Sequence, residues 1–180
     1  MSFDHVMFKK DTLKQSYFIT VETYNSGDTL WNNIQRDILV NLSKNHFTVF
    51  HLYNDSGISN ISQLDDKIGE LYPFFESKTD EYFIEVMPND SRFLTKVMND
   101  SLIFQCGNLF HIAIFKEKPN LYDYSITMKN AEFVIHSFYD NLGFYIDIQN
   151  TNQDDIFVET TVKSVLNSYH IAINNESLEP

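Results

Sequence analysis

Short runs of β-branched and aromatic residues alternate along the chain with segments rich in Asn, Asp, Ser and Gly. Such runs, each closed by turn-forming residues, are typical of β-strands. The runs that predict strands cover residues 16–24, 47–53, 81–87, 101–106, 109–115, 121–127 and 144–148. The pair 101–106 and 109–115 flanks Gly107 and Asn108, which favours an antiparallel hairpin.

Other segments carry apolar residues three or four positions apart, which is the spacing of an amphipathic helix. The clearest is 28–44, where aliphatic side chains recur at every fourth position, namely Leu30, Ile34, Ile38 and Leu42. Further helices are expected at 63–72, 90–98 and 129–141, the last of them ended by Gly143. Residues 154–169 predict either one helix or a strand over 156–161 followed by a helix over 162–169. The β-branched run at 160–162 favours the break.

Together these elements predict an α+β fold in a single domain over residues 1–180. Helices and strands alternate early in the chain, but the expected hairpin in the middle favours a mostly antiparallel or mixed central sheet. We expect about six or seven strands and about four helices. A chain of 180 residues can bury one hydrophobic core without a disulfide. Cys106 is the only cysteine, and we expect it to be a small buried hydrophobe.

Composition narrows the functional classes. The chain has 25 acidic and 13 basic residues, a net charge of −12 and 15% aromatic residues. The aromatic content excludes a disordered acidic tail, and the charge disfavours direct binding of nucleic acid, which needs clustered Lys and Arg. Only 5 glycines are present, and they form no phosphate-binding loop. No signal peptide or transmembrane segment is evident, so we expect a cytoplasmic protein without membrane contact.

The six histidines match no metal-ligand or catalytic motif, so we expect no metal, no cofactor and no catalytic residue. His46 and His51 flank a predicted strand at an odd spacing and should point to opposite faces. A triad of His111, Asp147 and a serine stays open, because triads depend on geometry and not on spacing. Glu81 and Glu85 share one face of a predicted strand, which weakly permits a metal site.

Acidic residues are densest between residues 65 and 85, where seven carboxylates accompany two lysines. Such a charge run is either a solvated face or a surface that attracts a basic partner, with neighbouring aromatic side chains as anchors. The residues expected to bind the partner are Asp65, Asp66, Glu70, Tyr72, Phe74, Phe75, Glu76, Asp80 and Glu81. A second acidic stretch holds Asp154, Asp155 and Glu159, and the sequence leaves open whether the two stretches adjoin.

In its size, acidity and aromatic content, the chain resembles bacterial toxin-immunity proteins, especially those of contact-dependent growth inhibition. The resemblance is compositional, covers the whole chain and transfers no individual residue. It implies a protein that binds a cognate basic toxin domain, often a nuclease, and neutralises it by covering the active site or the substrate-binding cleft. Two alternatives remain: a DNA mimic of the anti-restriction type, and an enzyme with a dispersed carboxylate and histidine site.

Overall fold

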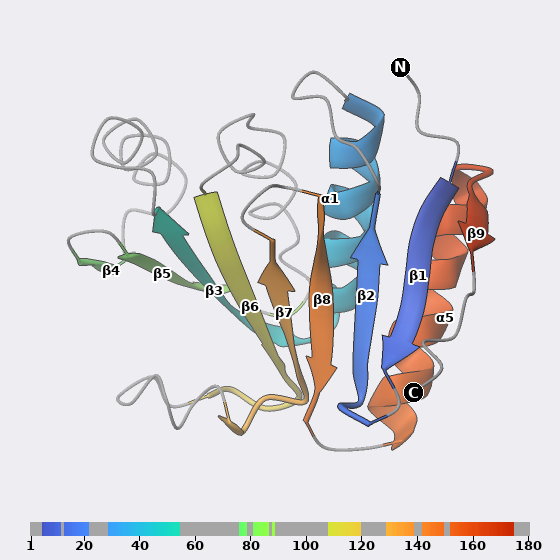
Figure 1. Ribbon diagram of the computed structural model, residues 1–180. Helices are drawn as coiled ribbons and strands as arrows, with labels where there is room; N and C mark the ends of the chain where they lie inside the picture. The colour runs from blue at the N-terminus through green and yellow to red at the C-terminus, as the bar shows by residue number, and fades with distance from the viewer. Residues whose placement is uncertain are drawn as a thin grey trace.

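A computed structural model describes residues 5–11, 13–21, 29–54, 76–78, 81–86, 88, 108–119, 129–138, 142–149 and 152–174. Within these residues two helices cover one face of a single sheet (Figure 1). The strands are β1 (His5–Asp11), β2 (Ser16–Thr20), β3 (Phe47–Asn54), β4 (Glu76–Lys78), β5 (Glu81–Val86), β6 (Asn108–Phe115), β7 (Phe133–Ser137), β8 (Gly143–Ile148) and β9 (Ala172–Asn174). The helices are α1 (Thr29–Ser43) and α5 (Asn152–Ser168).

The sheet is mixed and almost entirely antiparallel. Its strand order is β4-β5-β3-β6-β7-β8-β2-β1-β9. Every neighbouring pair is antiparallel except β1 and β9. Seven strands have five residues or more, and the three-residue strands β4 and β9 are added at the two edges. The expected α+β class and the expected antiparallel or mixed sheet are therefore confirmed.

Several expected elements coincide with observed ones. The strands expected at 16–24, 47–53, 81–87, 109–115 and 144–148 correspond to β2, β3, β5, β6 and β8, and the helix at 28–44 corresponds to α1. Strands β1, β4 and β9 were not expected. The expected strands 101–106 and 121–127 and the expected helices 63–72 and 90–98 lie outside the described residues. Strand β6 pairs with β3 on one side and with β7 on the other, so the hairpin expected between 101–106 and 109–115 is wrong, because other strands occupy both edges of β6.

The expected number of about four helices is not supported, since the described residues contain two. The helix expected at 129–141 is wrong, because its centre is strand β7. Phe133 and Ile135 are buried in the main core, while Val134 is buried in a second cluster on the opposite face. A strand buried on both faces forms a continuous apolar run, and periodicity alone does not distinguish such a run from a buried helix. Gly143 begins β8 and does not end a helix.

The C-terminal segment forms one helix, so the alternative with a break at 160–162 is wrong. The inward face of α5 is carried by Val158, Val162, Val165 and Leu166, all of them buried. These positions recur three to four residues apart along a helix, so packing against the core outweighs the lower helix propensity of Thr and Val.

The two helices lie on the same face of the sheet, behind it in the view of Figure 1. There they bury the main core, in which Trp31 of α1, Tyr17 of β2 and Phe144 of β8 are almost fully inaccessible to water. The other face carries a smaller apolar cluster that includes Val49, Ala113, Phe115, Ala131 and Val134. The two described helices therefore cover one face of the sheet, and the residues of the second cluster are buried on the other face.

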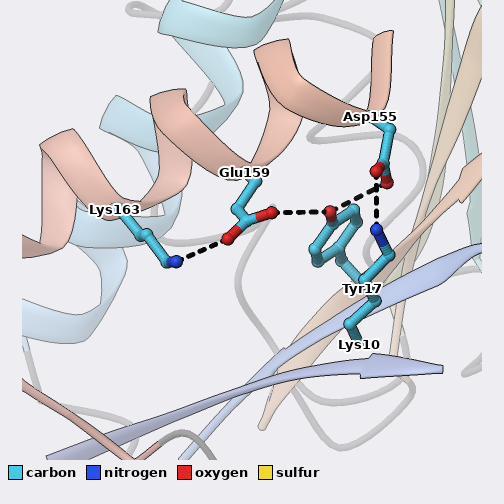
Figure 2. A network of polar contacts seen from close by, with 5 residues as sticks. All are labelled: Lys10, Tyr17, Asp155, Glu159 and Lys163. Carbon is cyan, nitrogen blue, oxygen red and sulfur yellow. Dashed lines mark hydrogen bonds and ion pairs between the residues drawn. The ribbon is translucent and has the colours of Figure 1, made fainter. Parts of the chain in front are cut away.

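A network of polar groups attaches α5 to strands β1 and β2 (Figure 2). The Tyr17 hydroxyl lies 2.8 Å from Asp155 Oδ1 and 3.2 Å from Glu159 Oε2. Lys10 pairs with Asp155 at 2.5 Å, and Lys163 pairs with Glu159 at 2.5 Å. Burial and the two carboxylates raise the pKa of Tyr17, so its hydroxyl stays protonated and can donate. The network gives the buried phenol a partner, as a buried hydroxyl requires.

We expect Tyr17→Phe to lower the free energy of unfolding by about 1–2 kcal/mol, the usual cost of deleting one buried hydrogen bond. Urea denaturation of the purified protein measures this value. Tyr145→Phe is the matched control, since it removes the same atom from a ring whose hydroxyl makes no hydrogen bond to another described residue. Equal losses in the two variants would contradict a role for the network in holding α5.

Candidate functional site

Of the residues expected to bind a partner, the structure describes only the backbone of Glu76 and Glu81. Glu76 lies in β4 opposite Phe83, and Glu81 begins β5 between Lys78 and Tyr53. The remaining expected residues lie outside the described ranges, namely Asp65, Asp66, Glu70, Tyr72, Phe74, Phe75 and Asp80. Their arrangement therefore stays a prediction.

The second acidic stretch serves internal contacts. Asp154 is 5% exposed and pairs with Lys116 at 3.2 Å, while Asp155 and Glu159 belong to the network around Tyr17. Asp154 and Asp155 lie in the first turn of α5, where negative charge also favours the helix. The stretch secures α5 to the sheet and is not an open acidic surface.

The net negative charge is distributed unevenly between the described residues and the rest of the chain. The described residues include 11 of the 25 acidic residues and 10 of the 13 basic residues. The rest of the chain therefore holds 14 acidic and 3 basic residues. Outside strands β4 and β5, most acidic residues in the described part of the chain pair with a basic residue. Asp37 pairs with Arg36, and Glu132 and Asp154 both pair with Lys116. The sheet and its helices are therefore close to neutral, and almost all of the −12 comes from the connecting and terminal segments.

Most of these acid-rich segments begin or end at one end of the sheet. The strand register places Val21, Asn54, Asn108 and Leu142 at the same level, which is the upper end in Figure 1. Segments 1–4, 22–28, 55–75, 79–80 and 139–141 connect to strands there. Their acids are Asp4, Glu22, Asp28, Asp55, Asp65, Asp66, Glu70, Asp80 and Asp140, against a single base, Lys67. Segment 89–107 reaches the same end with two acids and two bases.

We name the acids just listed, with the end of the sheet that their segments join, the acidic end. The described residues that these segments join are nearly neutral. At the other end of the sheet, the described segment after β6 carries Lys116, Glu117 and Lys118. Outside the described residues, segments 120–128 and 175–180 contain Asp123, Glu176 and Glu179. The asymmetry follows from strand register, which the sequence alone does not reveal.

Three of the six histidines form a row across the face of the sheet opposite the two described helices. His51 of β3 stands opposite His111 of β6, and His111 stands opposite His136 of β7. Their ring centroids are 5.6 Å and 4.8 Å apart, respectively. Tyr145 of β8 extends the line by stacking on His136 at 4.6 Å. We call His51, His111 and His136 the histidine row.

A chain of polar contacts connects the histidine row to β2. His111 Nδ1 lies 2.6 Å from His136 Nδ1, which is a hydrogen bond between the two rings. His136 Nε2 lies 3.5 Å from Asp147 Oδ2, and the Ser16 hydroxyl donates to Asp147 Oδ1 at 2.5 Å. The order is serine, aspartate, histidine, histidine. In a nucleophilic triad the serine contacts the histidine, whereas here Ser16 contacts the aspartate. This arrangement is therefore not the triad of His111, Asp147 and a serine that the sequence left open.

Burial favours the neutral forms of His111 and His136 at pH 7. It lowers the pKa of His111 to about 4, and the neighbouring His136 and His51 add to the shift. Burial also lowers the pKa of His136, although the nearby Asp147 carboxylate opposes the change. The two neutral imidazoles can therefore share one hydrogen bond, in which one ring donates and the other accepts.

The histidine row does not have the geometry of a metal centre. Two ligands of one tetrahedral zinc ion lie about 3.3 Å apart, given a metal–nitrogen bond of about 2.0 Å. The two Nδ1 atoms are closer than that, at 2.6 Å. Within the described part of the chain, no group of three or more His, Cys, Asp and Glu side chains is arranged to hold a metal.

Sequence reasoning missed the row because each histidine lies on a different strand. Only the pairing registers bring residues 51, 111 and 136 to one level. One related expectation is confirmed: His46 and His51 lie on opposite sides of the sheet. His46 packs near Phe133 and Phe157 on the side of the helices, while His51 belongs to the row.

No helix among the described residues has both the length and the apolar character needed to cross a lipid bilayer. Comparison of the chain with protein-family models, with curated proteins and with solved structures gives no match.

Proposed function

We propose that this chain is an immunity protein, which binds a cognate basic toxin domain and neutralises it by covering its active site or substrate-binding cleft. The observation that carries the proposal is the distribution of charge. A nearly neutral scaffold of strands and helices is joined, at one end of the sheet, by segments with nine acids and one base.

Electrostatics explains why this distribution suits a basic protein partner. Charges within about 8–10 Å of each other act together at physiological salt, so acids in segments that join the same end of a sheet can attract a basic surface more strongly than acids on segments that join different ends. A toxin that acts on nucleic acid needs a cationic cleft for phosphates. Carboxylates presented at that cleft compete with the substrate, and a nuclease is therefore the toxin class that we expect.

Binding also needs contacts that exclude water. Segment 55–75 supplies three aromatic residues beside its acids, namely Tyr72, Phe74 and Phe75. Aromatic side chains commonly provide most of the binding energy at the centre of an interface, while charges set the association rate and the choice of partner. The same segment thus contains both kinds of residue that a tight protein interface uses.

A DNA mimic is less well supported. Such a protein needs unpaired carboxylates spaced like phosphates along an extended surface. The acids of α1 and α5 contact basic residues or tyrosines of this chain: Asp37, Asp154, Asp155 and Glu159. A concentration of acids at one end favours a compact protein partner over mimicry of a long duplex.

The proposal is tested by rescue of cell growth. Co-expression of this chain should protect cells from a toxin domain encoded beside its gene, and the purified proteins should form a complex that weakens as salt rises. Failure to rescue from any neighbouring toxin, together with no basic protein recovered at low salt, would contradict the proposal.

A further inference from the structure

The His111–His136 contact holds only one proton between its two nitrogens. At 2.6 Å, one Nδ1 must donate and the other must accept. If both rings were protonated, two N–H groups would face each other at this distance. The contact is therefore compatible with the neutral pair, or with one charge on the pair, and incompatible with two.

The tautomers follow from the next contact in the chain. His136 Nε2 faces the Asp147 carboxylate at 3.5 Å, and a carboxylate accepts hydrogens. A neutral His136 that carries its hydrogen on Nε2 has a bare Nδ1, so His111 must donate from its own Nδ1. The geometry thus assigns the Nε2–H tautomer to His136 and the Nδ1–H tautomer to His111.

Among the described side chains, one carboxylate contacts the pair: Asp147 of β8 faces His136, and the Ser16 hydroxyl donates to its other oxygen. Tyr145 of β8 stacks on His136, and His51 of β3 stacks on His111. The next level of strands β3, β6 and β7 is apolar, with Val49, Ala113 and Val134. By register, the same face of the neighbouring strands carries Glu81, Phe83 and Glu85 on β5, Phe18 on β2, and Lys9 and Asp11 on β1.

We propose that the histidine row is an acid-sensitive latch of the sheet, in which one shared proton closes the junction of β6 and β7 at neutral pH and protonation of both rings opens it. The junction joins two halves of the sheet: β4, β5, β3 and β6 lie on one side, and β7, β8, β2, β1 and β9 lie on the other. The proposal does not depend on the identity of any partner.

The direction of the pH effect follows from linkage. Burial lowers the pKa of His111 to about 4 in the folded protein, against about 6.5 in an unfolded chain. Between these values the unfolded state binds more protons, so stability is complete above about pH 6.5 and falls as the pH drops toward 4. From His111 alone, the unfolding equilibrium constant should rise about 30-fold between about pH 7.5 and about pH 5.

The test compares urea denaturation of three full-length proteins at these two pH values: the wild type, His111→Gln and His170→Asn. Gln can donate to His136 but does not titrate. His170 is an exposed histidine with φ of 56°, a backbone conformation that Asn tolerates, so it controls for loss of one histidine. We expect the acid-induced rise to be about 30-fold smaller in His111→Gln than in the wild type, and unchanged in His170→Asn.

Equal pH dependence in wild type and His111→Gln would overturn the latch. If His111→Gln does not fold, nitrogen NMR of the wild-type imidazoles decides the matter. It should show the Nδ1–H tautomer for His111, the Nε2–H tautomer for His136 and no protonation of His111 until well below pH 6. Titration of His111 near 6.5, or Nε2–H tautomers in both rings, would contradict the proposal.

Discussion

Replacing Gly143 with alanine should lower the free energy of unfolding by about 3 kcal/mol or more, and replacing it with valine should prevent folding. Gly143 has φ of 156°, where L side chains rarely occur, and a Cβ there would collide with the Ile19 carbonyl oxygen and approach Thr20 Cα to 2.9 Å. The collision is with backbone, which cannot rotate away as a side chain could.

The surrounding strands leave β2 little freedom to move. It pairs with β8 on one side and with β1 on the other, and the Gly143 carbonyl also accepts a hydrogen bond from Phe138 N at 2.9 Å. Urea denaturation measures the loss, with Thr160→Ala on the exposed side of α5 as the control. A Gly143→Ala protein as stable as the wild type would contradict the close approach of β8 to β2.

Reversing three acids of the acidic end should weaken binding of the toxin domain at least 100-fold. The triple variant Asp65→Lys, Asp66→Lys and Glu70→Lys replaces attraction by repulsion at three places in one segment. Like charges facing each other across an interface cost several kcal/mol. The loss should be larger at about 0.05 M salt than at about 0.3 M, where the Debye length is shorter.

Calorimetric titration of the purified toxin domain measures the affinity, and urea denaturation shows whether the triple variant is as stable as the wild type. Unchanged affinity in a stably folded variant would remove segment 55–75 from the binding surface. In that case the acids of segments 22–28 and 139–141 would be the next to test.

Local pattern was enough to predict the elements that bury one face. Helix α1 and strands β2, β3 and β8 were predicted, because each places apolar residues at the period of its own structure. Strand β7 was taken for a helix because Phe133, Val134 and Ile135 are buried on both faces. Helix α5 was ambiguous because its Thr and Val residues favour strands in isolation, whereas in the fold they pack on the core.

The functional features depend on strand order and register, which local pattern does not contain. The histidine row needs β3, β6 and β7 to be neighbours in one register. The acidic end needs the connections after β2, β3 and β7 to lie at the same level. The sequence indicated that the chain is acidic, and the sheet shows that its described scaffold is nearly neutral.

The central claim is that the position of the negative charge, more than its total, determines binding of the toxin domain. The most direct measurement compares the dissociation constants of Asp66→Lys and Glu117→Lys, which change the net charge equally. Glu117 is exposed and follows β6, at the end of the sheet opposite the acidic end. We expect Asp66→Lys to weaken binding about tenfold or more and Glu117→Lys to change it less than about twofold. Equal effects of the two substitutions would contradict the claim.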